Sequence, residues 1–366
     1  MAFDAQEAQA TLSNYLKEEL DNTMRNRPFW NKMQARSRIR FNVGGADLQW
    51  PVRRSIRGAR PHNDTITPQF DTYNLFERAT ITFRGYWAGE RLGRFQLQRN
   101  RGPQAFIDLM NDAKNRLGPD LMQSIQDDVF IDGGATGNED KWEGFETFLG
   151  AQASQTGDSG RVRLPDDSYA NITTDLAAYG GSWTNVSGET ATYSWPNGTG
   201  RNPSFDFWAP LLVDTTATAW GTNPSFGVFG LSQLTYGIQY AMRQPHATAV
   251  TMLDLILMTT ADYFNFKNLY QGSERIISER TPVEKSVGYT LLNYDGVDIG
   301  MDFGVPASTI YGLMFNQIEY ISPAPQMFEV LAPRPTIDES AMLFPAYAHG
   351  NFKYNPRGFV KWYPYT

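Results

Sequence analysis

Two long β-type runs separated by a turn constrain the fold of this chain more than any other feature. The runs Arg38–Ile56 and Thr65–Ala88 are rich in Val, Ile, Thr, Phe, Tyr and Trp, and the segment Arg57–Asp64 between them has turn chemistry. We interpret them as one hairpin. Arms of near twenty residues would reach roughly 60 Å, and an isolated two-stranded hairpin is only marginally stable in water. The hairpin should therefore lie on something, and a neighbouring subunit is the natural candidate.

Charge is divided unevenly along the chain. The net charge of −7 comes from 32 basic and 39 acidic residues, but the segment from Asn22 to Arg60 carries +9 and the remainder −16. Such a basic arm is typical of contact with nucleic acid or with the acidic body of another copy, and a solvated basic face is the simpler alternative. Most basic residues are Arg, and aromatic residues are 14% of the chain. Both classes are enriched at protein interfaces.

The residue inventory excludes several kinds of chemistry. The chain has no Cys and only three His, namely His62, His246 and His349. This excludes disulfides, thiolate zinc sites and Cys nucleophiles, and it makes a His-rich metal site improbable. No segment resembles a membrane span or a signal peptide. We expect no cofactor and no metal.

Catalytic constellations are sparse. The acid pairs Asp127–Asp128 and Asp166–Asp167 are the nearest candidates, and adjacent carboxylates are common on solvated loops. The glycine-rich segment Val129–Gly137 lacks the Gly-Lys-Ser/Thr of a phosphate loop and is predicted to be a turn. We therefore expect a protein that is not an enzyme. A glycoside hydrolase, which could use any two carboxylates, stays the main enzymatic alternative.

Hydrophobic spacing predicts helices mixed with strands. An amphipathic helix is expected over residues 4–24, and a helix of about seven turns over Pro103–Val129. The second contains Gly118-Pro119, so it is either one kinked helix or two short ones. The remaining elements are a helix at Leu231–Met242, a strand at Ala249–Met258, a helix capped by Thr259 or Thr260 and running to Gln271, β-rich stretches at Tyr289–Met301 and Ile310–Ile321, and a strand pair within Phe344–Trp362 around Asn355–Gly358. Helices and strands interleave without a βαβ rhythm, so the predicted class is α+β.

The order of these elements resembles the major capsid proteins of tailed bacteriophages, which have the Hong Kong-phage-type capsid fold. The N-terminal segment and long hairpin resemble the family's N-arm and E-loop, and Pro103–Val129 resembles its spine helix. Phe130–Gly137 with Trp142–Phe145 is similar to the Gly/Asp-rich turn after that helix. Ala249–Met258 with Thr260–Gln271 resembles an axial-domain unit, and His349–Gly358 resembles the closing peripheral strand. Only residues 150–208 fall outside the resemblance.

The resemblance implies a division of the chain. It comprises an N-terminal arm at 1–42, an extended E-loop hairpin at 43–90, a peripheral domain with the spine helix at 91–149, a polar β-type insertion at 150–208, an axial domain at 209–322, and return strands of the peripheral domain at 323–366.

The resemblance also implies a function. The chain would be a structural protein that self-assembles into the hexamers and pentamers of an icosahedral phage head around double-stranded DNA. Its location would be the virion capsid, assembled in the host cytoplasm and without contact with a membrane. Its partners would be many copies of itself, packaged DNA bound without sequence specificity, and separate scaffold, portal and decoration proteins.

Two departures from the family matter. No Lys lies between Lys32 and Lys114, so the hairpin lacks the lysine of members that crosslink covalently, and we expect a non-covalent shell. The chain starts without a long acidic or coiled-coil segment, so we expect a scaffold that is separate or a segment that is processed.

The basic arm supplies the candidate contact residues. We hypothesise that its arginines contact neighbouring subunits, with salt bridges expected above all from the last four. The candidates are Arg25, Arg27, Arg36, Arg38, Arg40, Arg53, Arg54, Arg57 and Arg60.

A second class of function stays open. The Trp- and Tyr-rich region 150–208 could present a carbohydrate-binding surface, as in a β-rich tail-associated or glycan-binding protein.

Overall fold

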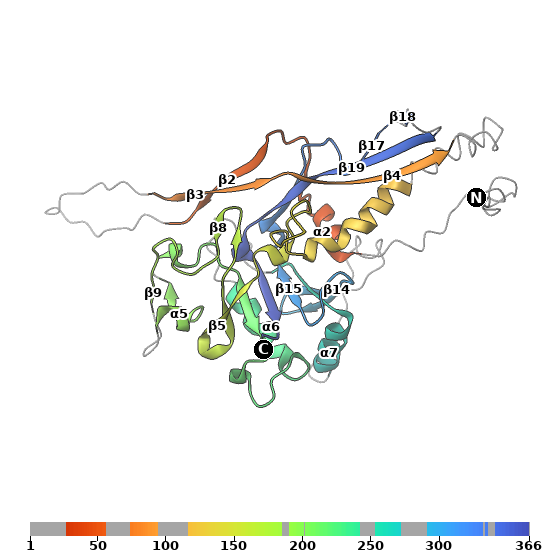
Figure 1. Ribbon diagram of the computed structural model, residues 1–366. Coiled ribbons are helices and arrows are strands. Elements are labelled where there is room, and N and C mark those ends of the chain that lie inside the picture. The colour runs from red at the N-terminus through yellow and green to blue at the C-terminus, as the bar shows by residue number, and fades with distance from the viewer. Residues whose placement is uncertain are drawn as a thin grey trace.

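The computed structural model describes residues 27–55, 74–93, 116–184, 190–200, 202–241, 253–271, 291–331, 334–335 and 341–365. Within them, helices and strands alternate irregularly along the chain, so the predicted α+β class is confirmed. Two long β-ribbons run along the upper edge of the molecule in Figure 1, and a body of sheet and helices lies beneath them.

An eight-stranded mixed sheet forms the centre of the body. Its order is β13 (Leu292–Tyr294), β14 (Val297–Met301), β12 (Leu255–Met258), β15 (Ile310–Leu313), β20 (Val360–Tyr363), β11 (Leu211–Asp214), β6 (Val162–Pro165) and β5 (Ala151–Gly157). Side chains of β12 alternate between two cores: Leu255 and Leu257 face one, and Ile256 and Met258 face the other. A strand buried on both faces has an unbroken apolar sequence, which is the pattern that predicted it.

The first upper ribbon belongs to a second sheet built around the 14-residue strand β19 (Ala341–Tyr354). One end of β19 pairs with β16 (Ile318–Ile321), and its other end pairs antiparallel with β4 (Arg84–Gly93), from Ala341 opposite Gly93 to Gly350 opposite Arg84. The short strands of this sheet are β1 (Ile39–Arg40), β17 (Glu329–Val330) and β18 (Arg334–Pro335).

The second upper ribbon is the hairpin of β2 (Asp47–Arg53) and β3 (Phe76–Thr82), paired from Asp47 opposite Thr82 to Arg53 opposite Phe76. The base of the predicted long hairpin is thereby confirmed, and residues 56–73 lie outside the described residues. The hairpin is shorter than expected at the two ends that lie furthest from the turn. There, Ile39–Arg40 pairs with β16 and Arg84–Gly93 pairs with β19. Two smaller hairpins pair β7 (Ser168–Tyr169) with β8 (Ile172–Thr173), and β9 (Trp183–Thr184) with β10 (Thr199–Gly200).

Helices pack against the sheet, and short 3₁₀ turns lie between the other elements. The α-helices are α2 (Pro28–Ala35), residues 116–125, α5 (Ala191–Ser194), α6 (Phe226–Ala241) and α7 (Thr260–Gln271). The 3₁₀ turns are η1 (Gln126–Phe130), η2 (Phe145–Thr147), η3 (Asp158–Gly160), η4 (Pro203–Phe205), η5 (Thr218–Trp220), η6 (Phe315–Gln317) and η7 (Pro356–Gly358). Thr259 caps α7, because its Oγ1 accepts from the Asp262 N–H at 3.2 Å.

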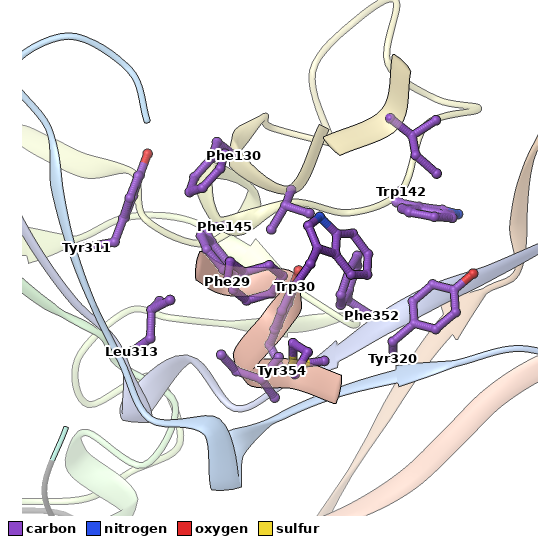
Figure 2. Close-up of a cluster of buried hydrophobic side chains, with 14 of the residues drawn as sticks. Phe29, Trp30, Phe130, Trp142, Phe145, Tyr311, Leu313, Tyr320, Phe352 and Tyr354 are labelled. Atoms are coloured by element: carbon purple, nitrogen blue, oxygen red, sulfur yellow. The ribbon is translucent and has the colours of Figure 1, made fainter. Parts of the chain in front are cut away.

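Aromatic rings dominate the core beneath the ribbons (Figure 2). Helix α2 begins at Pro28, a residue suited to the first helical position, and it inserts Phe29 and Trp30 into this core. The Phe29 ring meets that of Phe145 edge-on at 5.4 Å between centroids, and Trp142 meets Phe352 in the same way at 5.7 Å. Such pairs contribute roughly 0.5–1.5 kcal/mol beyond their burial. Because these residues come from three distant parts of the sequence, the core joins the start of the described chain to its end.

The helices agree only in part with their expected limits. The helix expected at Leu231–Met242 starts earlier, at Phe226, and residues 116–125 are helical through Gly118-Pro119 with Leu117, Leu121 and Ile125 buried. The helix expected at 4–24 lies outside the described residues, and so do residues 103–115. Because the first half of Pro103–Val129 is not described, the choice between one kinked helix and two short ones stays open.

One expectation was wrong in detail. The strands flanking Asn355–Gly358 do not pair with each other, because β19 and β20 lie in different sheets. The region 150–208, expected as a polar β-type insertion, supplies β5 and β6 to the eight-stranded sheet, and its residues Tyr169 and Trp195 are fully buried. Several of its aromatic residues pack inside, whereas Tyr193 is exposed.

None of the helices in the described ranges is long and apolar enough to cross a membrane.

Candidate assembly surfaces

The β4–β19 ribbon presents an exposed face with aromatic side chains. Trp87 on β4 lies opposite Tyr347 on β19, and the indole is 75% exposed. The Tyr347 ring stacks on His349, with centroids 5.8 Å apart and planes 10° from parallel. Gly85 lies opposite His349, where a Cβ would come within 2.5 Å of the imidazole Nδ1. This face of the ribbon therefore carries a large exposed aromatic ring.

The β2–β3 hairpin has a second exposed aromatic residue. Phe76, at the first position of β3, is 54% exposed, whereas Ala79 and Ile81 further along the same strand are buried against the body. The hairpin is thus held at its inner end, where the Thr80 N–H donates to the Ala170 carbonyl at 3.0 Å. Its other described end also contacts the body, because the Ser204 Oγ donates to the Arg54 carbonyl at 2.8 Å.

The Gly/Asp-rich turn expected after the helix holds the ribbon in place. Arg84, the first residue of β4, donates to the carbonyls of Gly133 at 2.9 Å and Lys141 at 2.6 Å and pairs with Glu143 at 3.2 Å. Burial raises the pKa of the Glu143 carboxyl, and the Arg84 cation opposes that rise. Gly144 admits no side chain, because a Cβ would lie 2.4 Å from the Ile131 carbonyl oxygen. The motif therefore has a structural role.

Arg27 is buried in its own chain. Its side chain is 3% exposed, its Nε donates to Gln126 at 2.9 Å, and its guanidinium pairs with Asp302 and Asp127. Burial raises the pKa of Asp302, and the Arg27 cation opposes that rise. These contacts join the start of α2 to segments about 100 and 275 residues away. Arg27 thus acts within its subunit, and this is a correction to its place among the expected inter-subunit contacts.

The other candidate arginines lie nearer the surface. Arg36 pairs with Asp254 at 2.9 Å, Arg40 pairs with Glu319, and Arg54 pairs with Glu77 at 3.6 Å. Arg38 donates to the Asn316 side chain, and Arg53 donates to the Ser55 carbonyl at 3.1 Å. Arg25, Arg57 and Arg60 lie outside the described residues. Contacts of these eight residues with a neighbouring copy stay a prediction.

The acid pairs serve local structure. Asp128 pairs with Lys141 at 3.3 Å, and Asp127 pairs with Arg27. The Asp167 Oδ2 accepts from the Gly150 N–H at 2.8 Å, and burial raises the pKa of Asp167 to about 6. Across the described ranges, no group of three His, Cys, Asp or Glu side chains is arranged to hold a metal ion.

Two tryptophans of region 150–208 are closed to stacking on a sugar. Trp195 and Trp208 are buried, and their indole N–H groups donate to Asp206 at 3.1 Å and to the Tyr169 carbonyl at 3.3 Å. A ring used for stacking on a sugar must be open on one face, so these two cannot serve in that way.

Comparison with solved structures identifies the fold. The capsid of a native GTA particle superposes with a TM-score of 0.53 at 14% identity, covering 96% of this chain and 93% of that one. The cyanophage A-1(L) capsid superposes with a TM-score of 0.53 at 12% identity, covering 99% of each chain. This chain has the Hong Kong-phage-type capsid fold. No protein-family model matches the sequence, and no curated protein matches it significantly.

The capsid fold accounts for the arrangement of ribbons and body. The β2–β3 hairpin falls within 43–90, the range expected for the E-loop, and the helix at 116–125 falls within the range expected for the spine helix. Sequence reasoning did not single out the aromatic side chains of the two ribbons, namely Trp87, Tyr347 and Phe76, as candidates for a contact surface. Alternation predicted the strands, but it carries no information on which face of a ribbon stays uncovered.

Proposed function

We propose that this chain is the major capsid protein of a tailed bacteriophage. Many copies would assemble into the hexamers and pentamers of an icosahedral head around double-stranded DNA. The observation that carries the proposal is the likeness to the GTA and cyanophage A-1(L) capsids over nearly the whole length of both chains. A shell subunit needs its whole fold for assembly, so coverage of the whole chain supports the proposal more strongly than a shared domain would.

The exposed faces of the two ribbons support the same function. A single copy leaves Trp87 and Phe76 in water, although large aromatic side chains are enriched in the centres of protein interfaces. Contacts spread along two long ribbons let many modest interfaces add up to a stable shell.

Charge supports assembly in a second way. The segment 22–60 carries +9 and the rest of the chain −16, so the arm of one copy complements the body of the next. We propose that Arg36, Arg38, Arg40, Arg53 and Arg54, together with Arg25, Arg57 and Arg60, form contacts between subunits. We expect a non-covalent shell, because the segment between Lys32 and Lys114 has no lysine.

We propose that the chain is divided as the family resemblance implies: arm at 1–42, E-loop at 43–90, peripheral domain at 91–149, region 150–208, axial domain at 209–322 and return strands at 323–366.

The proposed location is the virion capsid, assembled in the host cytoplasm. Separate scaffold, portal and decoration proteins are the proposed partners. The role is structural and not catalytic, since the acid pairs are engaged in local contacts.

Electron microscopy and sedimentation of the purified full-length chain test the proposal. Closed shells, tubes or rings of capsomers are expected. A stable monomer or trimer at every protein and salt concentration would contradict the proposal. If that species bound glycans, the tail-associated alternative would be favoured, and if it hydrolysed them, the enzymatic alternative would be.

A charge-reversed variant tests the arginines. Arg54→Glu combined with Arg57→Glu should shift assembly to higher protein concentration, with the largest effect at low salt because exposed charges are screened as salt rises. Arg334→Glu, on the short strand β18, is a control for surface charge. Unchanged assembly of the double variant across a salt titration would show that these residues make no inter-subunit contacts.

A further inference from the structure

A cavity lies where the β2–β3 hairpin joins the body. Its volume is about 370 Å³, and its walls come from β2, the segment 203–208, β16 and the turn after β19. The residues that matter for its chemistry are Arg38, Trp50, Arg53, Tyr354, Lys353 and Arg357. The size suits a small polar group with part of the segment that carries it.

Two buried polar groups in the walls lack partners. Arg357 is 6% exposed, and one guanidinium nitrogen pairs with Asp206 at 3.0 Å, but its Nε has no hydrogen-bond partner among the described residues. The Tyr354 hydroxyl, also buried, has none there either. Leaving a buried donor without a hydrogen bond lowers stability, so each such group calls for a partner. Both groups are hydrogen-bond donors.

Positive charge exceeds negative charge in the same walls. Among the described residues that line the cavity, Glu319 is the one carboxylate. The four cations are Arg38, Arg53, Lys353 and Arg357. Lys353 lies 3.6 Å from Glu319 and above the Trp50 ring at 5.5 Å. Arg38 and Arg53 donate to neutral groups, namely the Asn316 amide oxygen and the Ser55 carbonyl. The cavity is therefore suited to an anion, and arginine in particular pairs with carboxylates.

We propose that this cavity binds the carboxylate of an Asp or Glu side chain from another copy of this chain. The inference rests on the proposed function, because it requires that copies assemble. A second copy fits for two reasons. The chain outside residues 22–60 carries −16 and so supplies acidic side chains. The cavity also borders the Trp50–Arg53 end of the hairpin, where Arg53 lies opposite the exposed Phe76. The Trp50 ring and neighbouring apolar walls would cover the methylene groups of the incoming side chain.

Zero-length crosslinking of assembled particles tests the proposal directly. A carbodiimide joins a Lys amine to a carboxylate in contact with it, with loss of water to the reagent, so Lys353 would report what occupies the cavity. The Glu319→Gln variant removes the competing carboxylate. Particles are assembled from equal amounts of ¹⁴N- and ¹⁵N-labelled variant, crosslinked, digested and analysed by mass spectrometry. We expect Lys353 joined to an Asp or Glu peptide, in pairs that mix the two isotopes.

The outcomes separate the inference from the function on which it rests. Particles that form without a mixed-isotope link at Lys353, or with links only within one copy, would overturn the inference and leave the proposed function intact. A chain that forms no assemblies would overturn both, and this is seen by microscopy before any crosslinking.

Charge variants give an independent measure. Arg53→Gln should raise the protein concentration needed for assembly by about fivefold, the effect expected for one partly buried charge pair. Glu319→Gln should lower that concentration, because it removes the negative charge from the walls. Arg334→Gln, outside the cavity, has the same net charge as Arg53→Gln and should have no effect. Equal effects of Arg53→Gln and Arg334→Gln would contradict the proposal.

Discussion

Replacing Gly237 with Ala tests how helix α6 packs on the eight-stranded sheet. In the interior of a helix, Gly→Ala normally stabilises a protein by about 0.5–1 kcal/mol. At Gly237 the sign should reverse, because an added Cβ would come within 2.2 Å of the Trp362 ring on β20.

The Trp362 ring cannot easily move away. It is fully buried, and its Nε1–H donates to the Gln233 carbonyl at 2.8 Å. Gln233 lies on α6, one turn before Gly237. Overpacking of this kind costs about 1–3 kcal/mol. After the usual gain from removing a glycine, we expect Gly237→Ala to lower the free energy of unfolding by about 1–2 kcal/mol.

The control lies on the same helix. Gly227 is exposed, and a Cβ there would meet only the Asn265 side chain at 4.0 Å. Gly227→Ala should therefore be neutral or stabilising by up to about 1 kcal/mol. Urea denaturation of the unassembled subunit, followed by tryptophan fluorescence, measures both variants. If Gly237→Ala stabilised the chain as much as Gly227→Ala, the close contact between α6 and β20 would be wrong.

Three further predictions follow from the described contacts. Burial raises the pKa of Asp167 to about 6, so the folded chain holds this proton more tightly than the unfolded chain, and the ionised carboxylate lowers stability above pH 6. Asp167→Asn should raise the free energy of unfolding by about 1 kcal/mol at pH 8, a value that allows for the partial exposure of this side chain, and by little at pH 4. Equal gains at both pH values in urea titrations would contradict this. Arg27→Met should cost about 3 kcal/mol in the same assay, because it leaves Asp302 buried without its cation, and Asp302→Asn added to it should recover part of the loss. Trp87→Ser should change subunit stability by less than about 0.5 kcal/mol but raise the assembly concentration in sedimentation several-fold; unchanged assembly would remove Trp87 from the interface.

Local patterns predicted the elements whose causes are local. The apolar run at the end of Ala249–Met258 forms β12, and Thr259 caps α7 with its own hydroxyl. The helix α2, which begins at Pro28, was not predicted. The same reasoning placed the hairpin base, because β-branched and aromatic residues on both sides of a turn cluster have few other stable arrangements. The order of these elements was enough for the resemblance to the capsid fold, which the solved structures then confirmed.

The sequence alone therefore determined the kinds of element, their order and the uneven distribution of charge. The tertiary structure decided the pairings: β4 joins β19 instead of the hairpin, β19 and β20 separate into two sheets, and Arg27 meets Asp302 across 275 residues. The physical reason is that spacing along a strand shows which side chains share a face. Which partner covers that face depends on packing between distant segments. The same packing leaves Trp87 in water and places four cations around one cavity.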